Sequence, residues 1–275
     1  MATAVTRPER RIANRERLIF ALDVPDLDGA RELVTRLGES VVFYKIGLEL
    51  ATSRHYFELL DWLVARDKKV FTDLKLYDIP ATVTAAVRQL SRSGASFLTV
   101  HGDRAIMEAA AAAKGAQLKI LVVTVLTSIA PQDLAEMGIG LSVEELVLLR
   151  ARQAVAAGCD GVIASGLEAE PLRKALGPQP LIVTPGIRPA DGARAHAGRD
   201  AGGPATQARA GMPAGEQRRE QLPGLVADDQ RRVVTPTIAF RSGADHIVVG
   251  RPIRDAADPY AAATAIQQEI AGVFG

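Results

Sequence analysis

Three charged residues, Asp73, Lys75 and Asp78, lie close together where a predicted strand ends. Asp73 and Lys75 are two positions apart, so an extended strand places both side chains on one face, with about 7 Å between their Cα atoms. In a barrel, that face could be the interior or the layer facing the helices. An aspartate beside a lysine could be a structural ion pair, because buried charges persist only when paired. Desolvation generally offsets the gain from such pairing, so three charges in this space favour a catalytic array of carboxylates and an ammonium.

Further candidate residues stand at the ends of other predicted strands. Asp23 ends the first strand, and Lys45 lies late in the second. Taken singly, each is equally compatible with an ordinary surface charge. Gly250 and Arg251 follow the last strand, where a backbone N–H and a guanidinium suit a phosphate group. Because these residues fall at corresponding strand ends, we expect them to share one site.

The elements that must position these residues are eight short β-branched runs, which alternate with segments of helical period. The runs span residues 17–23, 41–47, 69–76, 96–102, 118–127, 160–166, 180–186 and 245–253. Each is typical of a parallel strand buried on both faces, and three of the helical segments end at Gly38, Gly94 and Gly158. Eight such units predict an α/β protein, a (β/α)8 TIM barrel formed as one domain by residues 15–275. An open doubly wound sheet is the alternative, although no Gly-x-Gly-x-x-Gly follows the first run.

Composition narrows the function classes. The chain has 275 residues, 48% of them hydrophobic, and its formal net charge of +1 argues against a nucleic-acid partner. Cys159 is the single cysteine and cannot form an internal disulfide, so we expect a cytoplasmic protein. The longest apolar run, residues 120–126 with a break at Thr124, is too short for a membrane helix, and the first residues lack the apolar core of a secretory signal. We therefore expect no membrane partner.

Two segments depart from the alternation of strands and helices. Residues 1–14 are polar, and we expect them to form a loose N-terminal arm. Of the 41 residues from Pro189 to Asp229, 11 are Gly or Pro, a proportion typical of low-complexity sequence. We expect residues 190–227 to be a flexible loop inserted after the seventh strand, not a domain.

The segment DLKLYDIPAT (73–82) resembles the signature of the orotidine 5'-monophosphate decarboxylases, which catalyse the last step of UMP synthesis. The likeness covers most of the chain and keeps the family's order. The other matching blocks are ALD (21–23), KIGLEL (45–50), VTVLTS (123–128), VTPGIRP (183–189), DDQRRVVTP (228–236) and VVGRPI (248–253). This resemblance implies a carboxy-lyase with a barrel fold, acting as a homodimer without metal or organic cofactor.

The resemblance also implies a role for each matching residue. Lys75 would protonate carbon 6 of the pyrimidine, Asp73 would lie beside the departing carboxylate, and Lys45 would complete the charge array. Asp78, also catalytic, and Thr82 would reach into the partner subunit's site. The substrate-binding residues would be Asp23 and Lys45 at the ribose, Thr127 and Ser128 at the base, and Arg188, Gln230, Gly250 and Arg251 at the phosphate.

Two features differ from the family pattern. The fourth strand ends in VHGDRAIM without the paired glycines of the family, so His101 is assigned no role. The loop between Arg188 and Gln230 is short in the family and long here. We expect the extra residues to bulge outward while the flanking residues still converge, because loop closure costs only about 0.6 kcal/mol more per doubling of length.

Two alternative functions stay open. A Mg²⁺-dependent sugar-phosphate decarboxylase of the same superfamily would share the Asp-x-Lys-x-x-Asp motif, but would carry an acidic residue in place of Lys45. A catalytically silent barrel could instead bind RNA or a protein through the arginines of the insertion, although acidic residues dilute that charge. Loss of orotidine 5'-monophosphate absorbance in the presence of EDTA would discriminate all three.

Overall fold

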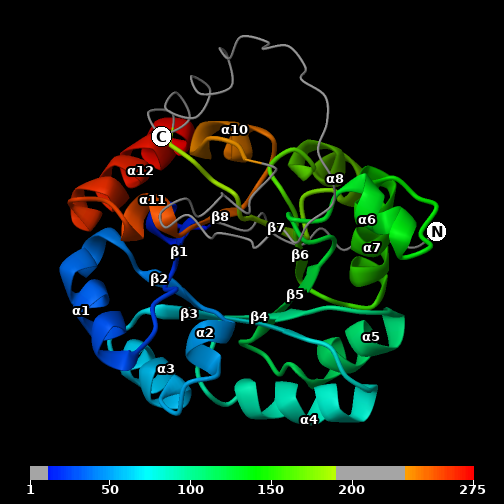
Figure 1. The fold of residues 1–275 in the computed structure, drawn as a ribbon, viewed down its shortest axis with the longest axis horizontal. Helices are drawn as coiled ribbons and strands as arrows, with labels where there is room; N and C mark the ends of the chain where they lie inside the picture. Colours follow the sequence, from blue (N-terminus) through cyan, green and yellow to red (C-terminus); the bar gives the residue numbers. More distant parts are fainter. Residues whose placement is uncertain (1–11, 190–232) are drawn as a thin grey trace, which may run out of the picture.

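The computed structural model describes residues 12–189 and 233–275, in which eight parallel strands close into a barrel (Figure 1). The strands follow one another around the barrel in chain order, and the last pairs with the first. They are β1 Leu18–Ala21, β2 Phe43–Ile46, β3 Lys69–Leu76, β4 Phe97–Val100, β5 Lys119–Val123, β6 Gly161–Ile163, β7 Leu181–Thr184 and β8 His246–Val249. Each lies inside one of the eight expected runs. The (β/α)8 barrel is confirmed, and the open sheet is wrong.

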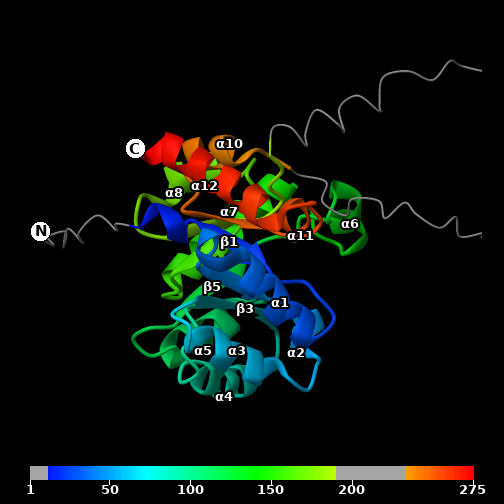
Figure 2. The ribbon, with the colours of Figure 1, turned by 90° about the vertical axis from the view of Figure 1, so that its left-hand side faces the viewer.

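Helices form an outer ring around the strands (Figure 1). The helices of this ring are α1 Leu27–Leu37, α3 Tyr56–Val64, α4 Pro80–Leu90, α5 Arg104–Ala113, α7 Val143–Ala156, α8 Ala169–Leu176, α10 Pro236–Arg241 and α12 Pro259–Phe274. Three short helices follow β2, β5 and β8 and lie toward one end of the barrel (Figure 2): α2 Leu48–Ala51, α6 Pro131–Glu136 and α11 Arg251–Arg254. Two 3-10 turns, η1 Asn14–Glu16 and η2 Gly38–Ser40, complete the described elements.

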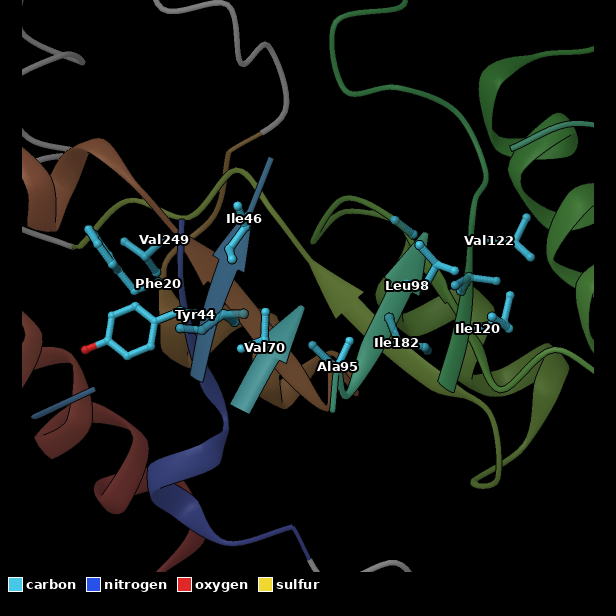
Figure 3. Packing of buried hydrophobic residues seen from close by; sticks show 14 of the residues in the cluster. Phe20, Tyr44, Ile46, Val70, Ala95, Leu98, Ile120, Val122, Ile182 and Val249 are labelled. Atoms are coloured by element: carbon cyan, nitrogen blue, oxygen red, sulfur yellow. The ribbon is translucent and has the colours of Figure 1, made fainter. Parts of the chain in front are cut away.

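Alternate strand residues build two separate apolar layers. Side chains such as Phe20 and Tyr44 belong to the large cluster that includes the helices (Figure 3). Their neighbours fill the barrel interior, where the Phe97 ring lies 4.9 Å from the Phe43 ring and 5.9 Å from the Phe71 ring, between centroids. Because Phe71 is part of the inner cluster, the strand face left open by the sequence is the barrel interior.

The predicted helix-ending glycines adopt the left-handed backbone. Gly38, Gly94 and Gly158 have φ of 51°, 80° and 84°. At Gly94 a β-carbon would also lie 2.9 Å from Cγ1 of Val64, the last residue of α3. Only glycine therefore fits there without moving the end of that helix.

Two aspartates link neighbouring strands through hydrogen bonds at the amino-terminal end of the barrel. The Asp160 carboxylate, just before β6, accepts from the Ile120 N–H of β5 at 2.9 Å and from the Lys114 ammonium at 2.7 Å. Asp245, just before β8, repeats the arrangement with a backbone N–H of β7 at 2.8 Å and the Arg173 guanidinium at 2.6 Å. These bonds join strands and helices at the end opposite to the strands' carboxyl ends.

The ends of the chain beside the second gap lie next to each other. Ile187 and Val234 form a parallel bridge, in which the Arg188 N–H donates to the Val234 carbonyl at 3.0 Å and the Val234 N–H donates to the Gly186 carbonyl at 3.2 Å. A β-carbon at Gly166 would lie 2.2 Å from Cγ2 of Val234, so glycine there allows Val234 to come this close. Most of the arm expected at 1–14, the loop expected at 190–227 and Gln230 lie outside the described residues.

Candidate active site

The inward face of the first three strands changes from apolar to charged at the carboxyl end of the barrel. Phe43 and Phe71 belong to the inner apolar cluster, and Lys45 and Asp73 follow them two residues later. A cavity of about 580 Å³ opens above this floor. Its lining includes nine of the residues expected from the sequence: Asp23, Lys45, Asp73, Lys75, Thr127, Ser128, Arg188, Gly250 and Arg251. The structure thus brings together residues from strands or loops far apart in the chain.

Two carboxylates and two ammonium groups alternate at the bottom of the cavity. The Lys75 Nζ lies 2.9 Å from Asp73 Oδ1, and the Lys45 Nζ lies 3.6 Å from Asp73 Oδ2. Lys45 also contacts Asp23 Oδ1 at 3.1 Å. The side chains of Lys45 and Asp73 are only 12% and 14% exposed, so solvent screens their interaction less than it would at the surface. The resulting chain of alternating charges runs from Asp23 to Lys75.

The charge state of Asp73 follows from its neighbours. Burial alone would raise the pKa of its carboxyl, since desolvation disfavours the charged form. The charges of Lys45 and Lys75, with hydrogen bonds from Lys75 and Thr99, outweigh burial and hold the pKa of Asp73 below its ordinary value. Asp73 is therefore ionised throughout the neutral range.

The two-residue spacing of Asp73 and Lys75 predicts a regular extended strand. The backbone at Lys75 differs from this prediction. Thr72 pairs with Leu98 and Leu76 with Val100, so three residues of β3 face Thr99 alone. Within this bulge Lys75 has φ of 49°, in the left-handed region that lysine seldom adopts. Bulges commonly redirect a side chain beside an active site, and this one directs Lys75 onto Asp73.

Arginines that follow the neighbouring strands β7 and β8 also line the cavity. Arg188 follows β7, and Arg251 begins α11 directly after Gly250. Arg254, one turn later in α11, also lines the cavity and donates from Nη1 to the Asp23 backbone carbonyl at 2.9 Å. Guanidinium groups in the lining of a cavity suit a phosphate group.

Asp78 and Thr82 do not line the cavity of their own chain. They lie in an exposed run, residues 77–82, between β3 and the first turn of α4. The Asp78 carboxylate accepts from the Ile79 N–H at 2.6 Å. Tyr77 and Ile79 on either side of it are 71% and 66% exposed. This run combines large apolar side chains with a carboxylate and a hydroxyl on the outside of the monomer.

Sequence reasoning missed two residues of the site, Thr99 and Arg254. The same alternation that placed Lys45 and Asp73 could have found Thr99, two residues after the inward Phe97. Arg254 could have been found from its spacing of three residues from Arg251 on a helix. His101, assigned no role, lies beside Tyr77 with 5.7 Å between ring centroids, and burial, then Arg150 and Lys75, lower its pKa.

Comparison with known proteins decides the family. The model of the Orotidine 5'-phosphate decarboxylase / HUMPS family matches residues 16–214 and 217–266. The chain belongs to this family. The resemblance read from the DLKLYDIPAT segment is thereby confirmed.

Relatives of the same family align over almost the whole chain. An orotidine 5'-phosphate decarboxylase of Methylococcus capsulatus is 52% identical over 259 residues, covering 94% of this chain and 93% of that protein. One of Stenotrophomonas maltophilia is 50% identical over 260 residues, covering 94% of each. The crystal structure of orotidine 5'-phosphate decarboxylase from Lactobacillus acidophilus superposes with a TM-score of 0.72 at 32% identity, covering 93% of this chain and 99% of that one.

Among residues 12–189 and 233–275, no helix is both long and apolar enough to cross a membrane.

Proposed function

We propose that this member of the family decarboxylates orotidine 5'-monophosphate to UMP. The observation that carries the proposal is the Lys75 ammonium, held 2.9 Å from Asp73 on the floor of a cavity that Arg188 and Arg251 also line. The names and the close similarity of the aligned relatives support the same reaction. The substrate carries a phosphate and a carboxylated pyrimidine, which suit the arginines and the pair of Lys75 and Asp73 respectively.

The chemistry requires a fixed positive charge. The bond between carbon 6 and the carboxylate breaks, CO₂ leaves, and the electron pair stays on a ring carbon that has no conjugated electron sink. An ammonium already placed at that carbon stabilises the developing charge without reorganisation. Lys75 then transfers a proton from Nζ to carbon 6, giving UMP, and regains a proton from water. The Asp73 carboxylate lies 2.9 Å from Nζ and orients the ammonium that this step requires.

Asp73 and Lys45 define the surroundings of the departing group. The ionised Asp73 would lie beside the substrate carboxylate and favour its loss as neutral CO₂. Lys45 lies near the other carboxylate oxygen of Asp73 and balances its negative charge. The Asp73 carboxylate can therefore stay ionised next to the scissile bond. Asp23 holds Lys45 at 3.1 Å and would bind the ribose hydroxyls together with it.

Binding of the phosphate is remote from the bond that breaks. We assign it to Arg188, Gly250 and Arg251, with Gln230 from the sequence comparison alone, and the base to Thr127 and Ser128. Such remote contacts contribute to catalysis when their binding energy orients the reacting carbon against Lys75.

Lys45 also bears on the Mg²⁺-dependent alternative. Its ammonium lies within 3.6 Å of both Asp23 and Asp73, so it occupies the space between the carboxylates and would repel a divalent cation there. We expect full turnover of orotidine 5'-monophosphate, followed by its ultraviolet absorbance, after treatment with EDTA. Activity that disappears with EDTA and returns with Mg²⁺ would support the alternative instead.

We further propose a cytoplasmic homodimer in which Asp78 and Thr82 complete the partner's site. The exposed run at 77–82 supports this proposal, since it presents Tyr77 and Ile79 beside these two polar residues. Lys75→Ala and Asp78→Asn homodimers should each be nearly inactive. Mixing them should restore activity, because a heterodimer has one site with both native residues. Proven heterodimers without recovered activity would contradict the shared site.

A further inference from the structure

Thr99 on β4 is a fully buried residue to which no catalytic or binding role has been assigned above. Its Oγ1 donates to Asp73 Oδ1 at 2.8 Å and accepts from the Lys75 backbone N–H at 3.0 Å. A backbone N–H can only donate, so the hydroxyl oxygen must accept from it and the hydroxyl proton points to Asp73. One side chain therefore contacts both members of the central ion pair.

The bulge in β3 explains why such a side chain is needed. Asp73 to Lys75 lie opposite Thr99 alone, and Lys75 has the left-handed φ of 49°. A backbone in this sparsely populated region persists only where its surroundings fix it. The Thr99 hydroxyl supplies the acceptor for the Lys75 N–H and anchors the bulge to β4.

We propose that Thr99 is a positioning residue for the decarboxylation, acting through Asp73 and Lys75. This inference rests on the roles proposed above for those two residues. Thr99 does not line the cavity, so it has no direct contact with a substrate bound there. Its hydroxyl fixes the Asp73 carboxylate with one bond and the Lys75 backbone with the other.

Loss of the hydroxyl should affect turnover more than binding. The Lys75 backbone would lose its acceptor, and the ammonium would sample positions away from carbon 6. Displacements of about 1 Å reduce catalysis up to about 100-fold. The substrate contacts of the arginines would remain, so KM should change little.

The experiment compares Thr99→Val with two matched variants. Thr99→Ser keeps the hydroxyl. Thr72→Val removes another fully buried hydroxyl, which donates to the Phe97 carbonyl at 2.9 Å and not to Asp73. We expect kcat to fall about 10- to 100-fold in Thr99→Val, with KM within about threefold, and both matched variants to stay within about threefold of wild type.

Two further measurements separate positioning from a merely structural effect. A hydrogen bond to the charged form lowers a pKa, so its loss in Thr99→Val should raise the pKa of Asp73 and move the acid limb of the kcat profile to higher pH. The Lys75 amide should exchange its hydrogen faster in Thr99→Val than in Thr72→Val. Thr99→Ala, which removes the same hydroxyl, replaces Thr99→Val with the same expectations if the valine variant does not fold.

Thr99→Val with the kcat of Thr72→Val would overturn the positioning role. So would a Thr99→Ser enzyme as slow as Thr99→Val, because the loss would then come from packing. High turnover in Lys75→Ala would instead contradict the proposed function, and the two failures are therefore distinguishable.

Discussion

Replacing Lys75 by alanine removes the ammonium that lies 2.9 Å from Asp73 and leaves Lys45, 3.6 Å from the same carboxylate, as its remaining cation. A unit charge developing about 4 Å from an ammonium gains about 4 kcal/mol at an effective dielectric constant of ~20. At 1.36 kcal/mol per tenfold, that corresponds to about 10³-fold in rate. The Lys75 side chain is 32% exposed, so screening reduces this term, while loss of the proton donor adds a factor of about 10² to 10⁴.

We therefore expect Lys75→Ala to lower kcat/KM by at least about 10⁴-fold, measured from the fall in orotidine 5'-monophosphate absorbance. Lys69→Ala is the matched control, because Lys69 begins the same strand but pairs with Glu16 at the opposite end of the barrel. It should retain kcat/KM within about threefold. A folded Lys75→Ala enzyme that keeps more than about a tenth of wild-type turnover would refute the reasoning.

Three other outcomes follow from the structure. Arg251→Ala should lower kcat/KM at least about 30-fold, since a charge-assisted contact worth about 2 kcal/mol is lost. Added inorganic phosphite should not restore decarboxylation of the unphosphorylated nucleoside by this variant, because the residue that would bind the phosphite is missing. Joining Ala193 to Pro223 through a short Gly/Ser linker should leave kcat/KM within about fivefold, whereas a hundredfold loss would show that the removed residues serve the site. Asp245→Asn should lower the free energy of unfolding by about 2 kcal/mol, because the Arg173 guanidinium loses its charged acceptor, and should leave kcat within about twofold, as thermal melts and steady-state rates together would show.

Sequence periodicity was sufficient to predict the barrel because each strand is apolar on both faces and is followed by a helix or turn. Gly38, Gly94 and Gly158 marked helix ends correctly, since their positive φ is a local requirement of the chain. The charged residues at the strand ends could be grouped into one site for a geometric reason. All parallel strands of a closed barrel end on the same side.

The bulge in β3 could not be predicted in this way. Regular alternation put Asp73 and Lys75 on one face, but the left-handed backbone of Lys75 depends on Thr99, which is 24 residues further along the chain. A contact between distant residues has no signature in the local period. The roles proposed for Asp78 and Thr82 are a similar case, because a residue that serves a neighbouring subunit would resemble an exposed residue of its own chain.

The bridge between Ile187 and Val234 holds the two flanks of the intervening segment together beside β7. Backbone bonds from Arg188 and Val234 close the chain beside β7, so the geometry next to the cavity is set before the intervening segment begins. A guest domain whose own termini are close together could therefore be spliced between these residues, as fusions are at sites where the host ends already meet. The decarboxylase would then carry a reporter or a binding module on the same face as its substrate entrance.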